Sequence, residues 1–425
     1  MELEKKNLEN TKKEKQKKNK KTSIIGPGIV LAATGIGSGD LITNTTVGSE
    51  FGIMLAWAVI IGVSLKLLLT ESVGRFTLAT GQTILEGWRS LGKWTMGYFI
   101  IYVTLFGLIY GASIASASGI MMYAILPIIP WWAWAIIHSV AGFTLIWFGR
   151  YKIFERVITV LIGIMSVTIV GSAIMLIPNL ADLPAEALIP AISSDSVYRV
   201  LSIVGGIGGT MALAAYGYWI QAKGWNDKSY IPFMRMDATV AYSVTGLFSI
   251  SLMVISTVFL YGSNVSFEGA NGIRDFLQLY GDSFGTAPQI ILTIGFWSAT
   301  VSSLLGSWNG IPYLFADFVR VMKKDYKTGS ENTQPITEKN PAYRVYLAWL
   351  TFPSMLLLLV NKPVGLILFY AALGSLFLPF LALTLLILLN SKQVGSEFRN
   401  KFYHNGLLVF VIVVFLTLGV VKLIG

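Results

Sequence analysis

Two hydrophobic segments of this chain are each interrupted in the middle by a glycine cluster. The first segment, residues 25–47, is broken at residues 35–40, and the second, residues 200–220, is broken at residues 205–210. Glycine destabilises a helix interior, and inside a bilayer every backbone group that leaves a helix needs another partner. Paired breaks of this kind in two halves of a chain are typical of secondary transporters, which bind their substrates there.

Composition places the chain among helical membrane proteins. Of its 425 residues, 54% are hydrophobic and only 13% are charged, and the mean hydropathy is +0.66. A soluble protein would have about 25% charged residues. The sequence has no cysteine, which excludes disulfides, thiolate metal ligands and a cysteine nucleophile.

Enzyme motifs are missing from the sequence as well. The chain has only two histidines, His138 and His404, and it contains neither an HExxH zinc motif nor a GxSxG nucleophile motif. The glycine-rich stretch at residues 205–209 lacks the lysine and serine or threonine of a phosphate-binding loop. We therefore predict that the protein is not an enzyme and has no cofactor.

The hydrophobic segments predict eleven membrane-spanning helices, each near or above the length of about 20 residues that crosses a bilayer. The third and the eighth are long enough to extend beyond the hydrocarbon. Residues 1–22 are polar and lysine-rich, which predicts a disordered tail. The predicted spans are residues 24–48, 52–74, 95–126, 131–149, 153–178, 199–222, 236–262, 286–320, 343–360, 364–389 and 406–424.

The distribution of positive charge predicts the orientation in the membrane. If the N-terminus is cytoplasmic, the tail and the cytoplasmic loops hold most of the lysines and arginines, whereas the opposite side has Arg199, Arg274, Lys362 and Lys422. Loops rich in lysine and arginine stay in the cytoplasm. We therefore predict a multi-pass protein of the plasma membrane (the cell inner membrane) with a cytoplasmic N-terminus and an extracytoplasmic C-terminus. The net charge of +10 then reflects topology and not nucleic-acid binding.

The two broken spans open two blocks of five spans. The first block covers residues 23–178, the second covers residues 199–389, and residues 390–425 add an eleventh helix. An odd number of spans per block inverts the second block relative to the first. The predicted fold is therefore an all-α polytopic membrane protein with the LeuT-type inverted five-plus-five helix repeat, in which the first and sixth helices are broken.

Several short motifs resemble the Nramp metal-ion transporter family. They are Gly26-Pro27-Gly28 through Phe51-Gly52 in the first span, Leu69-Thr70-Glu71 with Arg75 and Thr80-Gly81 in the second, Arg150-Tyr151-Lys152 with Glu155 at the fifth, Ser302-Ser303 with Gly306 in the eighth and Leu378-Pro379-Phe380 in the tenth. The motifs follow the family's order over nearly the whole chain after residue 24. The resemblance implies a secondary transporter of divalent metal ions.

The residues that bind metal in that family are largely absent. Where the family has Asp-Pro-Gly-Asn at the first break, this chain has Gly37 to Asp40, and the family's Met-Pro-His at the second break aligns with Ala212 to Ala214. A further histidine of that helix aligns with Trp219. Residues 95–126 contain no Asp, Glu or His, although the family's third helix carries acids implicated in proton movement. The resemblance therefore supports the fold and the transport class, but neither transition-metal selectivity nor proton coupling.

Asp40 is the one carboxylate that we predict near the bilayer midplane. Intramembrane acids are costly and usually functional, and unwound backbone beside Asp40 offers carbonyl oxygens to a cation. The alternative, which we favour less, is that Asp40 is the N-cap of the second half-helix, and both roles can hold together. The candidate substrate-binding or ion-binding residues are Asp40, Gly37, Ser38, Thr43, Thr210, Gly208, Gly209, Ala212, Tyr216 and Asn309, with Asp40 as the metal ligand.

Other polar side chains have two interpretations each. Lys66 could extend to the membrane interface or pair with Glu71, and Glu71 is expected to pair with Arg75 one turn away. Tyr216 either lines the substrate path or packs between helices. Asn309 either bonds a neighbouring helix or lines the pathway.

One carboxylate with hydroxyl and carbonyl oxygens forms a site that suits Mg²⁺, Ca²⁺ or Mn²⁺. Small residues at Gly37, Ala212 and Ala214 widen the cavity, which favours a hydrated ion and would also admit a small organic solute. We predict alternating-access transport of a divalent metal cation, for which the sequence does not support proton coupling. The alternative is transport of a small organic solute on the same fold, with Asp40 pairing a cationic group or a coupling ion. The partners are thus the transported substrate and the lipid bilayer.

Overall fold

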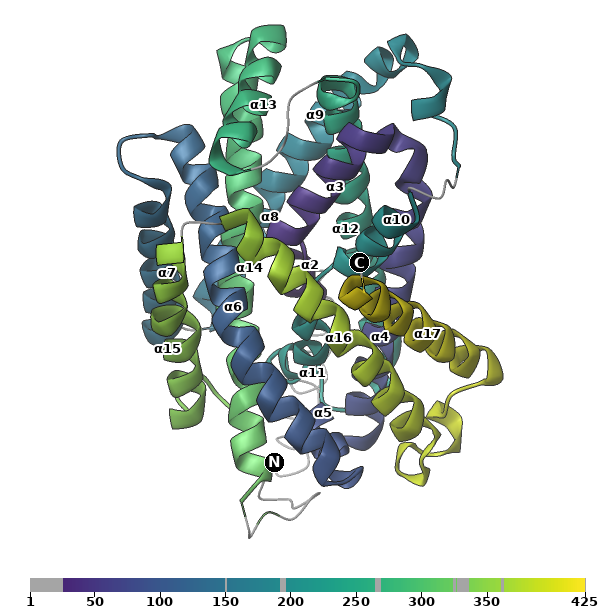
Figure 1. Ribbon diagram of the computed structural model, residues 1–425. Helices are drawn as coiled ribbons and strands as arrows, with labels where there is room; N and C mark the ends of the chain where they lie inside the picture. Colours follow the sequence, from purple (N-terminus) through teal and green to yellow (C-terminus); the bar gives the residue numbers. More distant parts are fainter. Residues whose placement is uncertain are drawn as a thin grey trace, which may run out of the picture.

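The computed structural model describes residues 26–149, 151–191, 196–263, 269–323, 326, 336–360 and 363–424, and the elements in this part of the chain are helical (Figure 1). The predicted disordered tail, residues 1–22, lies outside the described residues. The α-helices are α2 (Pro27–Gly35), α3 (Ser38–Phe51), α4 (Ala56–Thr80), α5 (Ile84–Ser90), α6 (Lys93–Ile125), α7 (Trp131–Phe148), α8 (Tyr151–Met165), α9 (Gly171–Leu176), α10 (Val197–Gly206), α11 (Met211–Ala222), α12 (Ile231–Leu260), α13 (Gly269–Phe284), α14 (Thr286–Val321), α15 (Pro341–Leu356), α16 (Pro363–Asn390) and α17 (Phe402–Ile424).

Eight helical stretches among the described residues are long and apolar enough to cross a membrane. One of them, Ser38–Thr80, joins α3 and α4 through a short 3₁₀ turn. The described apolar parts of α16 and α17, Leu376–Asn390 and Phe402–Thr417, are shorter. The helices α6 and α14 have 33 and 36 residues. At 1.5 Å per residue each is about 50 Å long, which exceeds the hydrocarbon thickness of about 30 Å as predicted for the third and eighth spans.

The first and the sixth predicted spans are each split into two helices. The helix α2 ends at Gly35 and α3 begins at Ser38. The helix α10 ends at Gly206 and α11 begins at Met211. Both breaks therefore occur at the glycine clusters, as predicted.

The half-helices α2 and α11 lie inside the bundle. The helix α2 packs against α8, α11, α12 and α14, and α11 packs against α4 and α14. Every residue of α11 from Met211 to Ile220 is buried. Figure 1 shows the long helices around these short ones. The unwound segments are thus enclosed by protein and not by lipid, which is where a bilayer tolerates non-helical backbone.

Glycines in α14 allow this close packing. A β-carbon added to Gly306 would lie 2.8 Å from the Thr34 β-carbon of α2, and one added to Gly310 would lie 2.5 Å from the Trp219 ring of α11. Small residues at helix contacts are typical of membrane proteins, because they let backbones approach. The two glycines fix the distance between α14 and both broken helices.

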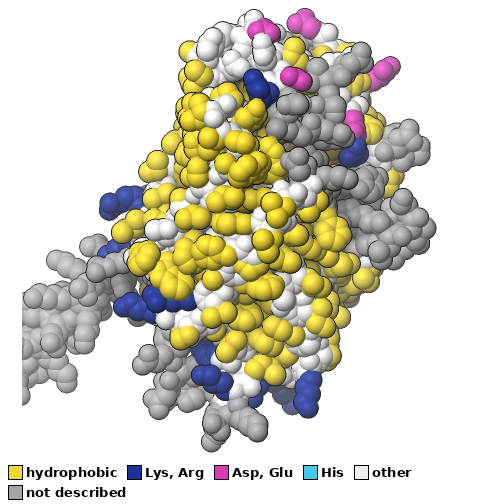
Figure 2. Space-filling model, turned by 60° about the vertical axis from the view of Figure 1, so that its left-hand side comes forward, with side chains coloured by type: hydrophobic (Ala, Val, Ile, Leu, Met, Phe, Trp, Pro, Cys, Tyr) yellow, Lys and Arg dark blue, Asp and Glu magenta, His cyan; other side chains and the backbone are white. Residues whose placement is uncertain are grey.

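The outer surface is apolar over a broad face of the molecule (Figure 2). Exposed apolar side chains of the described residues include Ile101, Val167 and Ile174, which are 61–75% accessible. In the same view most Lys and Arg side chains lie in the lower half, and the Asp and Glu side chains gather at the upper end. An apolar belt with charges toward its ends is the surface expected of a protein embedded in lipid.

The helix α13 (Gly269–Phe284) lies outside the predicted spans. It occupies the connection between the seventh and the eighth span and packs against α14 and α6. Its residues Phe276 and Tyr280 are buried, whereas Arg274 and Asp275 are exposed. It is an amphipathic helix on one end of the bundle, which a search for apolar segments does not detect.

Candidate functional site

The first break is two residues long. The Ile36 N–H still bonds the Ala32 carbonyl at 2.8 Å, but the Ile36 backbone is extended, as is that of Gly37, which forms the N-cap of α3. The free N–H groups at the start of α3 point toward the break, and a helix N-terminus carries a partial positive charge. This end of α3 is therefore suited to bind an anionic group.

Asp40 provides that anionic group and contacts both breaks. One carboxylate oxygen, Oδ2, accepts the Gly37 N–H at 3.4 Å, and the other, Oδ1, accepts the Gly208 N–H at 3.3 Å. The side chain is buried, with 2% exposed. Our alternative prediction that Asp40 is the N-cap residue is wrong in position, because the N-cap of α3 is Gly37, three residues earlier. Asp40 reaches back from the third residue of the helix.

The second break depends on left-handed glycines. Gly208 and Gly209 have φ angles of +74° and +72°, and Thr210 precedes the first residue of α11. A β-carbon added to Gly35 of the first break would lie 2.9 Å from the Gly208 carbonyl carbon. The two breaks, which are 168 residues apart at Asp40 and Gly208, therefore touch each other.

Lys66 of α4 reaches the second break from the side. Its ammonium donates hydrogen bonds to the Gly209 carbonyl at 2.5 Å and to the Gly205 carbonyl at 3.3 Å, and the side chain has no exposed surface. Both of our interpretations of Lys66 are wrong: it neither extends to the interface nor pairs with Glu71. The Glu71 carboxylate instead contacts Arg75 at 3.1 Å, as predicted, and Arg235 at 2.9 Å.

Neutral side chains complete the surroundings of Asp40. The Ser38 hydroxyl is buried, and among the described residues it has no hydrogen-bond partner. The Asn44 amide donates to the Asp40 carbonyl at 2.8 Å. The Ser303 hydroxyl of α14 donates to the Thr34 carbonyl at 2.8 Å, which satisfies part of the last turn of α2. The region thus offers hydroxyl and carbonyl oxygens beside one carboxylate.

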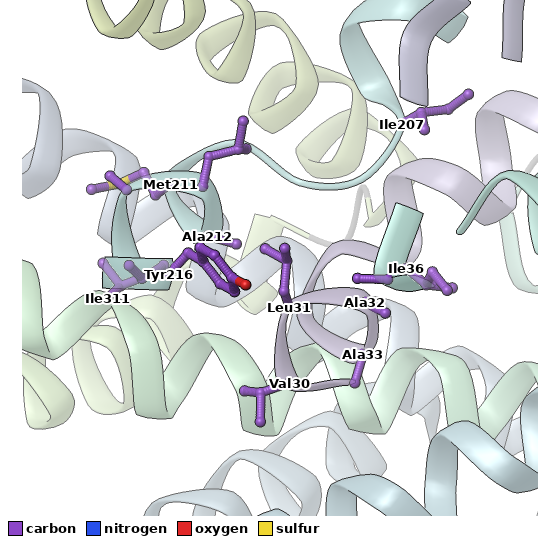
Figure 3. Close-up of a cluster of buried hydrophobic side chains, with 14 of the residues drawn as sticks. Val30, Leu31, Ala32, Ala33, Ile36, Ile207, Met211, Ala212, Tyr216 and Ile311 are labelled. Carbon is purple, nitrogen blue, oxygen red and sulfur yellow. The ribbon is translucent and has the colours of Figure 1, made fainter. Parts of the chain in front are cut away.

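The other candidate residues lie at different distances from this centre. A β-carbon added to Gly206 would lie 3.6 Å from the Thr43 hydroxyl, and one added to Gly374 of α16 would lie 3.5 Å from the Thr210 hydroxyl. These contacts place Thr43 and Thr210 beside the second break. Ala212 is buried in the first turn of α11, and Figure 3 shows it among buried apolar side chains that include Leu31 and Met211.

Tyr216 and Asn309 hold helices together. The Tyr216 hydroxyl donates to Asp237 Oδ2 at 2.8 Å, and Asn309 Oδ1 accepts the Trp219 indole N–H at 2.9 Å. Asn309 is therefore bonded to a neighbouring helix, which is one of its two predicted roles. In the described part of the chain, Asp40 forms no hydrogen bond with either Tyr216 or Asn309.

Asp237 of α12 is a functional candidate that the sequence analysis missed. Its Oδ2 atom accepts the Gly28 N–H at 2.6 Å, so this carboxylate lies at the N-terminus of α2, where a negative charge is stabilising. Both halves of the first broken helix therefore have an acid at their N-terminus. The signal in the sequence is an acid inside the seventh apolar span, two residues after Arg235.

A further polar cluster lies at the C-terminal end of α14. The Tyr218 hydroxyl donates to Asp317 at 2.5 Å, and Arg320 contacts Asp317 at 2.7 Å and Glu86 of α5 at 3.3 Å. Burial raises the pKa of Glu86 above its ordinary value, although the Thr83 N–H and Arg320 oppose the shift. These contacts connect α11, the helix that follows the second break, to α5 and α14.

The family of the chain follows from comparison with known sequences. The model of the family described as "Natural resistance-associated macrophage protein-like" (Nramp) matches residues 28–425. The chain is 21% identical to the uncharacterized membrane protein YcsG of Bacillus subtilis, over 98% of both chains. It is 23% identical to the metal transporter Nramp4 of Arabidopsis thaliana, over 88% of this chain and 73% of the relative.

Solved structures show the same fold. A mutant of the Eremococcus coleocola manganese transporter superposes with a TM-score of 0.75 at 16% identity, over 93% of this chain and 85% of that one. MhsT in complex with L-phenylalanine superposes with a TM-score of 0.63 at 14% identity, over 93% of this chain and 98% of that one. The predicted LeuT-type fold is confirmed. Because the family model extends over nearly the whole sequence, the chain belongs to the Nramp family.

Proposed function

We propose that this chain is a secondary transporter that moves divalent metal cations across the plasma membrane by alternating access around the two breaks. Family membership supports the substrate class, as do metal transporters among the relatives, such as Nramp4 of Arabidopsis thaliana. The observation that carries the proposal is the position of Asp40, whose buried carboxylate accepts N–H groups from both breaks.

The ligands around Asp40 favour a hard cation. The carboxylate, the Ser38 and Thr210 hydroxyls and the backbone carbonyls of the breaks are all oxygen donors. Among the described residues no group of three His, Cys, Asp or Glu side chains could hold a metal ion, so most ligands of a bound ion would be carbonyl oxygens and water. Mg²⁺, Mn²⁺ and Ca²⁺ accept such ligands, and Mg²⁺ in particular keeps several waters.

The sequence of α6 supports transport without proton coupling. This helix extends from Lys93 to Ile125 and contains no Asp, Glu or His between these ends. Proton relays through membranes use chains of such side chains. We therefore propose that the cation moves down its own gradient.

The site is closed to both sides in this structure. Asp40 and Ser38 are each 2% exposed and Thr210 is 6% exposed. Opening requires the half-helices to separate from their neighbours at one end or the other. At the α2 end the Gly28–Asp237 bond would break, and at the opposite end the Arg199–Glu50 pair, at 2.5 Å, joins α10 to the last turn of α3. Alternating access would open these two contacts in turn.

We further propose that the N-terminus is cytoplasmic. The concentration of lysine and arginine toward one end of the molecule supports this orientation (Figure 2), since positively charged loops are retained in the cytoplasm. The Asp237 contact would then belong to the cytoplasmic gate.

Uptake into proteoliposomes tests the proposal. Purified protein is reconstituted, and saturable uptake and counterflow of Mn²⁺, Mg²⁺ and Ca²⁺ are measured for the wild type and for Asp40→Asn. We expect the substitution to lower uptake by about tenfold or more, because a charged ligand contributes at least 1.5 kcal/mol to such contacts, that is, about a factor of ten. The matched control is Asp275→Asn on the exposed face of α13, which should transport like the wild type.

Two outcomes would contradict the proposal. Uptake that is equal in Asp40→Asn and the wild type would remove Asp40 from the mechanism. A wild type that takes up none of the three ions, but is stabilised against heat by a small organic compound, would support the alternative substrate class.

A further inference from the structure

Lys66 has an environment that is unusual for a lysine in a membrane helix. It lies in the middle of α4 and is completely buried. Its ammonium contacts two backbone carbonyls of the second break, those of Gly205 and Gly209. A buried lysine far from a helix end is costly and is rarely found without a specific partner.

The packing of α4 explains why the ammonium reaches this position. Gly62, one turn before Lys66, lets α4 approach α10, since an added β-carbon would lie 3.2 Å from the Val204 α-carbon. One turn after Lys66, the Thr70 hydroxyl bonds the Tyr242 hydroxyl at 2.9 Å. Residues 62, 66 and 70 share one helix face. On this face, Gly62 and Lys66 contact the second broken helix, and Thr70 contacts α12.

The two carbonyls are the kind of ligand that a bound cation uses. Unwound backbone carbonyls in broken membrane helices coordinate transported or coupling ions. An ammonium offers three N–H donors but no acceptor, so it can satisfy carbonyl oxygens that a metal ion would otherwise coordinate. Lys66 therefore occupies a cation position with a charge that is covalently attached to the protein.

The ammonium also balances Asp40. The Gly208 N–H binds the carboxylate and the Gly209 carbonyl binds the ammonium, so the two charged groups bond to adjacent residues of one backbone segment. They attract each other electrostatically. Glu71 does not compete for Lys66, because its oxygens contact Arg75 and Arg235.

We propose that Lys66 is a tethered cation that occupies the carbonyl position of the second break and sets the affinity of the site for the transported ion. A divalent cation that binds Asp40 must displace this ammonium from the Gly209 carbonyl or bind beside it. The native site is therefore a weak one, and it releases its ion when the ammonium returns. This inference rests on the proposed function and assigns the residue that determines its affinity.

Binding of Mn²⁺ to purified protein in detergent tests this role. Lys66→Ala frees the carbonyls and removes the charge, and we expect Mn²⁺ to bind about tenfold more tightly or better, because the repulsion between like charges in a poorly screened site is lost. Lys66→Gln keeps an N–H donor for the carbonyls and removes only the charge, and it should bind more tightly by a smaller factor. Lys152→Gln, on the exposed face of α8, is the matched control and should bind like the wild type.

Thermal unfolding shows whether each Lys66 variant is folded. Without metal, Lys66→Ala should melt below the wild type, because two buried carbonyls lose a partner, and Mn²⁺ should restore stability at a lower concentration than the wild type needs. In the double variant Lys66→Ala with Asp40→Asn, Mn²⁺ should no longer restore thermal stability at this lower concentration.

The results separate the inference from the proposed function. Wild-type uptake of Mn²⁺ together with unchanged or weaker Mn²⁺ binding in both Lys66→Ala and Lys66→Gln would overturn the tethered cation and leave metal transport standing. If neither the wild type nor any Lys66 variant binds a divalent cation, the proposed function fails, and the inference fails with it.

Discussion

The two breaks satisfy their free backbone groups in different ways. The first break carries its own acid, since Asp40 accepts the N–H of Gly37 three residues before it. The second break has no charged residue from Gly205 to Thr210, and its carbonyls are bonded by Lys66 of α4. A broken membrane helix can thus be stabilised by its own sequence or by a distant helix, and a linear sequence shows only the first of these.

The two breaks also need their glycines for different reasons. Gly208 and Gly209 have positive φ angles, a conformation that other residues rarely adopt. Gly35 and Gly37 have no such angle, but Gly35 contacts Gly208, and an added β-carbon on Gly37 would lie 2.9 Å from that of Ser303. The second break needs glycine for its backbone conformation, and the first needs it for close contact.

The largest expected effect comes from Gly208→Ala. A residue with a β-carbon in the left-handed conformation costs about 1–2 kcal/mol, and the added carbon would lie 2.9 Å from the Tyr242 ring. We expect the free energy of unfolding to fall by about 2 kcal/mol or more, measured by thermal unfolding of the purified protein. Gly206→Ala is the matched control. Its nearest contact would be the Thr43 hydroxyl at 3.6 Å, and alanine favours the helix. Equal destabilisation by both variants would contradict the conclusion that the second break needs glycine for its left-handed backbone conformation at Gly208.

A smaller effect is expected from Asp237→Asn. This change removes the negative charge at the N-terminus of α2 but keeps a side chain that can accept the Gly28 N–H. We expect a loss of about 1 kcal/mol in the free energy of unfolding, the size of a favourable charge at a helix end. Asp282→Asn on exposed α13 is the control and should change little. No loss in Asp237→Asn would show that the first broken helix depends on Asp40 alone.

Ser38→Ala should have the smallest effect on stability. The buried Ser38 hydroxyl has no partner among the described residues, so its removal should change the free energy of unfolding by less than about 0.5 kcal/mol. If the hydroxyl binds the transported ion, Mn²⁺ affinity should fall several-fold in an equilibrium binding assay. Unchanged affinity would remove Ser38 from the ligand set and leave the first break with Asp40 as its side-chain ligand.

Sequence patterns predicted the fold well because its signals are local. Runs of apolar residues and the glycine clusters at residues 35–40 and 205–210 are sufficient to place both breaks, and α6 and α14 are long as expected. The helix α13 was missed because half of its surface is polar. Asp40 was placed in the correct break, but it is the third residue of α3 and not its N-cap, since glycine at residues 37 and 39 obscures where α3 begins.

The site itself could be predicted only in part. The position of Asp40 at the first break was predictable because an acid in a glycine-rich membrane segment is conspicuous. For Lys66 the sequence offered the membrane interface or Glu71, whereas its partners are backbone carbonyls 139 and 143 residues further along the chain. Backbone acceptors have no sequence signature, and the face that a helix turns toward its neighbours depends on packing. The Asp237 contact with Gly28 was missed for the same reason.

On the proposed function, the opposite charges of Lys66 and Asp40, which bond neighbouring residues of the second break, have a consequence for the return half of a transport cycle. An empty carrier with a bare carboxylate would have to move one uncompensated charge within the electric field of the membrane, at a cost of up to about 2.3 kcal/mol per 100 mV. A carrier that holds its own positive charge beside the acid can reset without that electrical work. Its turnover when empty would then be insensitive to membrane voltage.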